Sequence, residues 1–114
     1  MAIFRRKNEL NFSEFLDQVQ KMRVTQANYQ PVTICHLVNA ENFTDSKIGI
    51  QEKLAVKNGL KKDDFKTFSN CPVFKVLAGK NMIEKIGDSY RLGIKLNESQ
   101  KAEVLKICME LLRK

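Results

Sequence analysis

The sequence has few of the residues on which enzyme active sites and metal centres depend. Its single histidine, His36, stands beside no partner at a spacing suited to catalysis or metal binding. The acidic doublet Asp63-Asp64 has no third ligand nearby, and no GxGxxG or P-loop glycine motif occurs. We therefore expect a protein that is not an enzyme and has no metal, cofactor or evident small-molecule ligand. His36 is expected to be structural or to lie at the surface.

The sequence has only three cysteines, and their positions do not suggest a disulfide bond. The three cysteines (Cys35, Cys71 and Cys108) are an odd number, lie far apart and form no CxxC motif. Their apolar neighbours predict buried free thiols in a reducing cytoplasm, without a disulfide scaffold or a zinc site. No apolar stretch approaches the length of a membrane span, and the N-terminal MAIFRRKNEL lacks the apolar centre of a signal peptide. We expect a cytoplasmic protein with no membrane partner.

The length of 114 residues suits one modest domain. Residues 1–10 form a basic lead-in that contains Arg5-Arg6-Lys7, and it is either a frayed terminus or an arm that reaches a phosphate backbone. Residues 11–114 are expected to form the single domain, since no internal repeat or low-complexity stretch divides them.

Helices with clear start signals are expected at both ends of this domain. Asn11 and Glu14 have the spacing of a capping box, and Asn97 and Gln100 repeat that spacing before the last helix. Both helices carry apolar residues at helical spacing. These stripes either close the core or pair with a second copy of the chain; their residues are Phe12, Phe15, Leu16, Val19 and Met22 in the first helix, and Val104, Leu105, Cys108, Leu111 and Leu112 in the last.

Two more helices are expected between them. Pro31 suits the first turn of a helix that is apolar on more than one side and therefore central and buried. Thr44 suits the N-cap of the next helix, which should stop at Asn58-Gly59.

A shorter helical run is expected over residues 72–78, with Asn70 as its candidate cap and a stop at Gly79. Residues 60–69 suggest a helical turn that leads into this run, and the two together are either one bent helix or two short ones.

Two strand-like runs follow, residues 82–86 and 89–94, joined by a turn at Gly87-Asp88. In the second run, Tyr90, Leu92 and Ile94 alternate with Arg91 and Gly93, the pattern of a half-buried strand. The order of elements predicts a mainly α fold with a small β-hairpin: a winged helix-turn-helix with additional N- and C-terminal helices.

The basic residues concentrate in the same part of the chain. The net charge is +7, from 20 lysines and arginines against 13 acidic residues, and the pI is near 9.5. Residues 43–95 hold ten lysines and one arginine against six acidic residues, so five of the seven net charges lie there. Such an excess attracts polyanions, although lysines on exposed helices are also an ordinary solvated face.

We expect double-stranded DNA as the partner. Residues with the chemistry to reach base edges lie on or beside the candidate recognition helix, whereas those of the wing would touch a phosphate or enter the minor groove. The full set of candidate DNA-binding residues is Lys47, Lys61, Lys62, Lys66, Thr67, Ser69, Asn70, Lys75, Lys80, Lys85, Ser89 and Arg91.

Five segments together resemble a known family: NYQPVTI (28–34), FT (43–44), NCPVFKVL (70–77), IEK (83–85) and YRL (90–92). Their order and spacing are similar to those of a winged-helix module at the N-terminal side of HNH and other restriction-type endonucleases of bacteria and archaea. The likeness spans roughly residues 28–112. It implies a duplex DNA-binding module, free-standing or part of a larger nuclease. This chain has no HNH-like histidine cluster, so any cleavage would be supplied elsewhere.

A protein–protein or dimerisation module of the same fold, without DNA binding, is the alternative. Its basis is the pair of apolar stripes in the terminal helices, which would join two copies into a homodimer.

Overall fold

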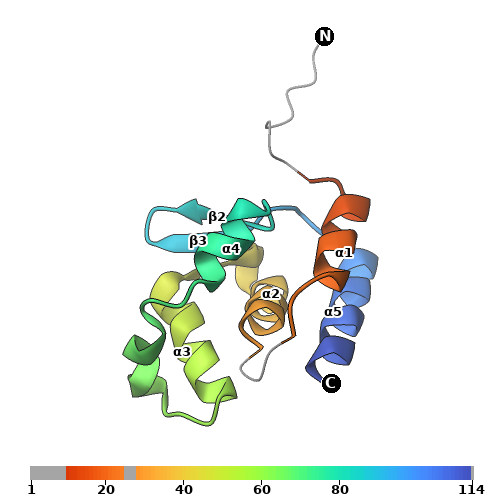
Figure 1. Ribbon diagram of the computed structural model, residues 1–114. Coiled ribbons are helices and arrows are strands. Elements are labelled where there is room, and N and C mark those ends of the chain that lie inside the picture. Colours follow the sequence, from red (N-terminus) through yellow and green to blue (C-terminus); the bar gives the residue numbers. More distant parts are fainter. Residues whose placement is uncertain (1–9, 25–27, 114) are drawn as a thin grey trace.

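The computed structural model describes residues 10–24 and 28–113 (Figure 1). The basic lead-in expected over residues 1–10 lies outside this part, apart from Leu10. The fold is mainly helical with one small antiparallel sheet. Its elements in chain order are α1 (Phe12–Gln20), α2 (Tyr29–Asn39), η1 (Glu41–Phe43), β1 (Thr44–Ser46), α3 (Lys47–Lys57), η2 (Lys62–Phe68), α4 (Val73–Gly79), β2 (Ile83–Ile86), β3 (Ser89–Leu92) and α5 (Glu98–Leu112).

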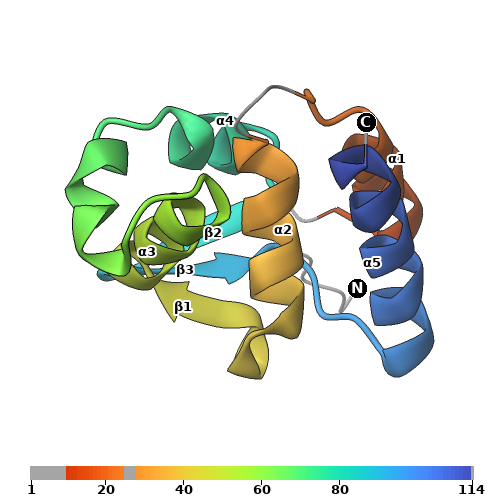
Figure 2. The ribbon, with the colours of Figure 1, turned by 90° about the horizontal axis from the view of Figure 1, so that it is seen from below.

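Helix α2 is the centre of the molecule. It contacts α5 on one side and α3, α4 and β3 on the other, so two groups of elements pack around it. The first group is α1 with α5, and the second is the sheet with α3 and α4, as Figures 1 and 2 show. Val32, Ile34, Leu37 and Val38 of α2 are all buried, which confirms the predicted central helix.

The sheet has three strands, one more than the sequence predicts. The hairpin of β2 and β3 turns at Gly87-Asp88 as expected, and β1 then adds to the free side of β3 in the order β1-β3-β2. Strand β3 ends at Leu92, so Ile94 lies beyond it, and β2 starts at Ile83. Because β1 immediately precedes α3, the sheet brings the hairpin tip to the first turn of that helix.

Both capping boxes occur as predicted. The Asn11 side chain accepts a hydrogen bond from the Glu14 amide at 2.8 Å, and Asn97 accepts one from the Gln100 amide at 2.8 Å. Each N3 side chain returns the bond by accepting from the amide of its cap residue. These local signals are strong because cap and partner are only three residues apart.

Two other predicted caps are wrong. Thr44 lies in β1, two residues before the true cap of α3. That cap is Ser46, whose hydroxyl accepts from the Gly49 amide at 3.0 Å. Asn70 does not cap α4: Pro72 occupies the N-cap position, without a side-chain bond. Because β1 pairs with β3, α3 starts later in the chain than predicted. Cys71 and Pro72 lie between Asn70 and the first residue of α4.

Residues 60–78 form two separate short helices and not one bent helix. The 3₁₀ helix η2 packs on α3 and ends at Phe68, and α4 begins at Val73. The buried Gln51 side chain donates a hydrogen bond to the Phe68 carbonyl at 3.3 Å. This carbonyl, at the C-terminal end of η2, therefore has a hydrogen-bond partner from α3. Gly59, with φ +80°, provides the left-handed residue that ends α3, as predicted.

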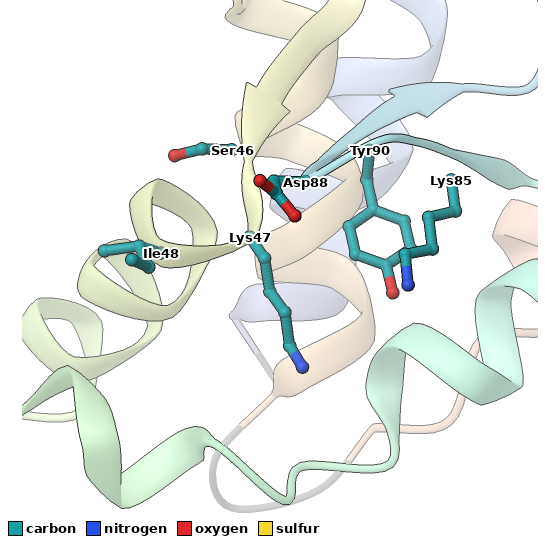
Figure 3. A pocket seen from close by; sticks show the side chains of 6 residues that line it. All are labelled: Ser46, Lys47, Ile48, Lys85, Asp88 and Tyr90. Carbon is teal, nitrogen blue, oxygen red and sulfur yellow. The ribbon is translucent and has the colours of Figure 1, made fainter.

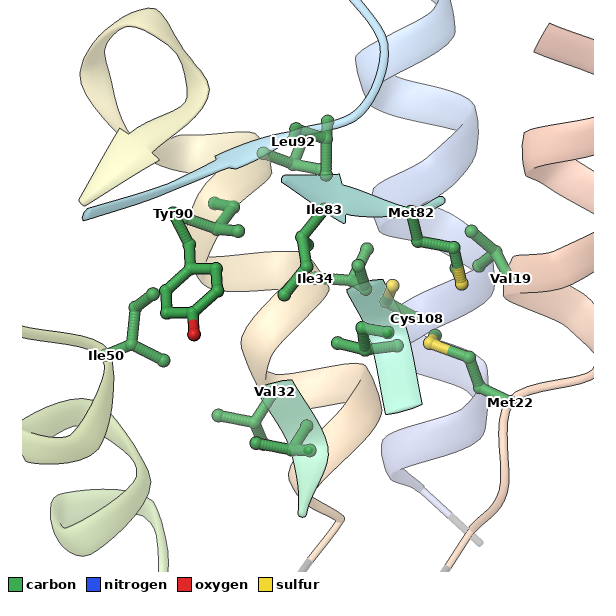
Figure 4. Packing of buried hydrophobic residues seen from close by; sticks show 14 of the residues in the cluster. Val19, Met22, Val32, Ile34, Ile50, Met82, Ile83, Tyr90, Leu92 and Cys108 are labelled. Carbon is green, nitrogen blue, oxygen red and sulfur yellow. The ribbon is translucent and has the colours of Figure 1, made fainter. Parts of the chain in front are cut away.

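The apolar stripes of the terminal helices face the core of the chain. Phe15, Val19, Val104 and Cys108 are fully buried. Figure 4 shows Val19 and Met22 directed towards Cys108 of α5 and towards Met82, so α1 and α5 close one side of a single hydrophobic core. Across the described residues, every helix falls short of the length and hydropathy that crossing a bilayer requires.

The three thiols are free but differently accessible. Cys108 is buried, whereas Cys35 and Cys71 are half-buried. Burial raises the pKa of the Cys108 thiol to about 12, and burial also raises the pKa of Cys35 and of Cys71 above the ordinary value.

We expect Cys108 to react with a thiol reagent far more slowly than the other two cysteines at pH 8, because only the exposed thiolate is nucleophilic. Time-resolved labelling with mass spectrometry would measure the three rates. In denaturant the rates should converge, and fast labelling of Cys108 in the native protein would contradict the packing of α5.

Candidate nucleic-acid interface

The strand register separates the predicted wing residues into two faces. Lys85 is paired with Tyr90 across the hairpin, and Ile86 is paired with Ser89. Because successive side chains of a strand point to opposite faces, Lys85 and Tyr90 share the face that is turned to the helices. Ser89 and Arg91 point to the other face, so the three predicted wing residues do not form one surface.

Arg91 also has a partner of its own. Its Nε donates a hydrogen bond to Glu84 Oε1 at 3.1 Å, and its terminal nitrogen forms an ion pair with the same oxygen. The two residues are opposite each other on β3 and β2. Part of the Arg91 charge is therefore neutralised on the outer face of the sheet, and Lys85 is the basic residue of the hairpin on the inner face.

A pocket of about 380 Å³ lies on that inner side, between the hairpin tip and the start of α3 (Figure 3). The Lys47 amide donates a hydrogen bond to the Asp88 carbonyl at 2.9 Å, which joins the first turn of α3 to the hairpin turn. The residues that line the pocket are Ser46, Lys47, Ile48, Lys85, Asp88 and Tyr90.

Aromatic rings support the pocket from α4 and β3. Phe74 of α4 stacks on Tyr90 with ring centroids 4.7 Å apart and planes 23° from parallel. The Lys47 ammonium lies 5.6 Å from the centroid of the Phe74 ring, within the range of a cation–π contact. Three elements that are distant in the sequence thus meet through Lys47, Phe74 and Tyr90. Sequence reasoning selected only Lys47 of these three.

Helix α4 presents few of the predicted base-reading side chains. Val73, Phe74 and Leu77 of α4 are buried. Lys75 is the one predicted DNA-binding residue within α4, and it is exposed. Thr67 is exposed on η2, and Ser69 and Asn70 are exposed in the turn that leads to α4. The predicted set is therefore spread over η2, a turn and one helical position.

The remaining predicted lysines lie around α3, η2 and the end of α4. Lys61, Lys62 and Lys66 are exposed at η2, and Lys62 is 3.8 Å from Glu52 of α3 in an exposed ion pair. Such a pair contributes little to stability. Lys80 is half-buried at the C-cap of α4.

His36 lies on the side of α2 that faces the sheet. Its Nε2 is 2.6 Å from Asp45 Oδ2 of β1, and Asp45 Oδ1 accepts from the Ser46 amide at 2.7 Å. A Cβ at Gly49 would lie 2.5 Å from the Asp45 carboxylate, so only glycine leaves room for it. This arrangement fits the structural role expected for His36. Among the described residues, no cluster of three or more His, Cys, Asp or Glu side chains could hold a metal ion.

A scan against protein-family models, a search of curated proteins and a search of solved structures each found no match to this chain.

Proposed function

We propose that this chain is a non-catalytic winged helix-turn-helix module that binds duplex DNA. The observation that carries the proposal is the order of elements: α2, β1, α3, α4 and the β2–β3 hairpin, with β1 paired to β3. In this reading α4 is the recognition helix, the hairpin is the wing, and η2 lengthens the connection between α3 and α4. The resemblance to restriction-associated modules is part of the same proposal, with any cleavage performed by another domain or protein.

The distribution of charge supports this reading. Lys47, Lys75 and Lys85 are exposed on α3, α4 and the hairpin, and none forms an ion pair with another described residue. Ammonium groups that are free of carboxylates are available to phosphates, and their binding releases counterions from the duplex. The free thiols fit residence in the reducing cytoplasm, which we include in the proposal.

Replacing Lys47 and Lys85 together with glutamine should weaken duplex binding about tenfold or more at low salt, and should lower the slope of log K against log salt by about two. The reason is the loss of two phosphate contacts on the inner side of the hairpin. A mobility-shift titration of a mixed-sequence duplex at several salt concentrations measures both quantities.

The matched control replaces Lys106 and Arg113 with glutamine. Both are exposed, Lys106 on α5 and Arg113 at its C-cap, and α5 packs on the other side of α2 from α3. This variant loses the same net charge as the test variant, so a general electrostatic effect would weaken both equally. Equal weakening of both variants would show that the α3–hairpin surface is not the DNA-binding site. If the wild type does not bind duplex DNA at low salt, the proposed function is wrong.

A protein–protein module remains the second candidate, and exposed apolar residues favour it. Ile48 and Val56 of α3 are 51% and 53% exposed, and Ile86 of the hairpin is 43% exposed. The terminal helices offer less to such an interface, because their apolar stripes pack in the core. Light scattering over a wide concentration range distinguishes the two: a stable dimer in the absence of DNA favours the second candidate.

A further inference from the structure

The pocket between α3 and the hairpin is lined by a tyrosine whose hydroxyl bonds to none of the described residues. Tyr90 is 9% exposed, its side chain lines the pocket, and it forms no hydrogen bond through its hydroxyl with any residue of the described ranges. Among the described residues, the buried side-chain polar atoms without a partner are Gln30 Oε1 and Thr33 Oγ1, so the Tyr90 ring is largely buried but its hydroxyl oxygen is accessible from the pocket. A ligand in the pocket can take the place of water as the acceptor of this hydroxyl.

Two lysines line the pocket and extend on the same side of it. In Figure 3 the ammonium groups of Lys47 and Lys85 and the Tyr90 hydroxyl point in the same direction, away from the hairpin turn. Neither lysine forms an ion pair with another described residue. The pocket also lies at the N-terminus of an 11-residue helix, whose partial positive charge favours an anion. Two ammonium groups and a hydroxyl form a donor set that suits a phosphate monoester.

The opposite end of the pocket has a different chemistry. Ile48 is 51% exposed there, and it offers apolar surface that a phosphate ion does not use. The Asp88 carboxylate lies by the hairpin turn, apart from the two ammonium groups in the view of Figure 3. It would repel a phosphate but can accept a hydrogen bond from a sugar hydroxyl or an exocyclic amine. The volume of about 380 Å³ is in the range of small-molecule sites.

We propose that this pocket binds a nucleoside monophosphate, either as the free nucleotide or as the phosphorylated end of a nucleic-acid strand. Lys47, Lys85 and the Tyr90 hydroxyl donate to the phosphate. Ile48 packs against the base, and Asp88 accepts from the sugar or the base. This proposal goes beyond duplex binding. A free nucleotide would bind in the pocket between α3 and the hairpin without any duplex being present.

The test is a titration of the full chain with deoxyadenosine monophosphate, followed by amide chemical shifts. We expect shifts centred on Lys47, Lys85 and Tyr90, and inorganic phosphate should bind at least tenfold more weakly because it leaves Ile48 and Asp88 unused. Lys85→Met should weaken the nucleotide about tenfold, and Tyr90→Phe should weaken it several-fold, as expected for one charge-assisted hydrogen bond each. Tyr90→Phe keeps the ring that stacks on Phe74, so the fold is retained.

Lys95→Met is the control, because Lys95 is exposed and does not line the pocket. A second titration compares a short duplex with and without a 5′-phosphate on an unpaired end nucleotide. Tighter binding of the phosphorylated end, with a weak free nucleotide, assigns the pocket to strand ends. Absence of pocket shifts with both probes, or equal affinity for inorganic phosphate, overturns the proposal. Duplex binding that persists in that case leaves the proposed function intact.

Discussion

Alanine in place of Gly93 should destabilise the protein by about 3 kcal/mol, the upper part of the range for an overpacked core site. A Cβ at this buried position would lie 2.3 Å from the carbonyl oxygen of Asn81 and 3.2 Å from the carbonyl carbon of Met82. Both are main-chain atoms, so no side-chain rotation can relieve the contact. The Gly93 amide also donates to the Met82 carbonyl at 2.8 Å, and this bond must lengthen when the two segments move apart.

Gly79→Ala provides the matched control. Gly79 is the last residue of α4, and an added Cβ would meet nothing within 4 Å. This change should be neutral or stabilising by up to about 1 kcal/mol, because alanine restricts the unfolded chain more than glycine does. Urea denaturation of the two variants gives both free energies. Similar stabilities of the two variants would contradict the close approach of residues 81 and 82 to Gly93.

Phe15→Ala should lower the free energy of unfolding by about 3–5 kcal/mol, the usual loss for a buried phenylalanine. Phe15 is fully buried in the core, on a helix that packs against α5. If the stripe of α1 serves the core of a single chain, the unfolding midpoint should not depend on protein concentration, either in the wild type or in the variant.

Met109→Ala is the comparison for this experiment. Met109 is on α5 and is 50% exposed, so its truncation should change stability by less than about 1 kcal/mol. A midpoint that rises with protein concentration, or a loss at Met109 as large as that at Phe15, would show that the terminal helices also hold a second copy.

The helix ends that sequence reasoning predicted correctly depend on contacts a few residues apart. Asn11 with Glu14, and Asn97 with Gln100, form their bonds within one helical turn, and Gly59 ends α3 through its own backbone angle. Local chemistry is sufficient at these places. The central burial of α2 was also predictable, because apolar residues on more than one side of a helix must be covered by neighbours on each side.

Strand β1 was missed for a different reason. Its three residues, Thr44, Asp45 and Ser46, have no apolar alternation, and they become a strand only by pairing with β3, more than 40 residues later in the chain. The same long-range pairing moved the helix cap from Thr44 to Ser46. The pocket was missed because it is assembled from β1, α3, β2, β3 and the turn between the last two, and the role of Tyr90 depends on a register that the sequence does not specify. Arg91 was grouped with Lys85 because the alternation within β3 does not show which residue of β2 lies opposite Tyr90, and the register places Lys85 there.

The hydrogen bond from the Lys47 amide to the Asp88 carbonyl has a consequence for recognition. A hairpin tip that is free in solution loses conformational entropy when a ligand orders it, and that loss is subtracted from the affinity. Here the tip is held by the first turn of α3 before any ligand arrives. The spacing between hairpin and helix is therefore set during folding, so this surface should discriminate between partners by rigid complementarity, with little adjustment of its backbone on binding.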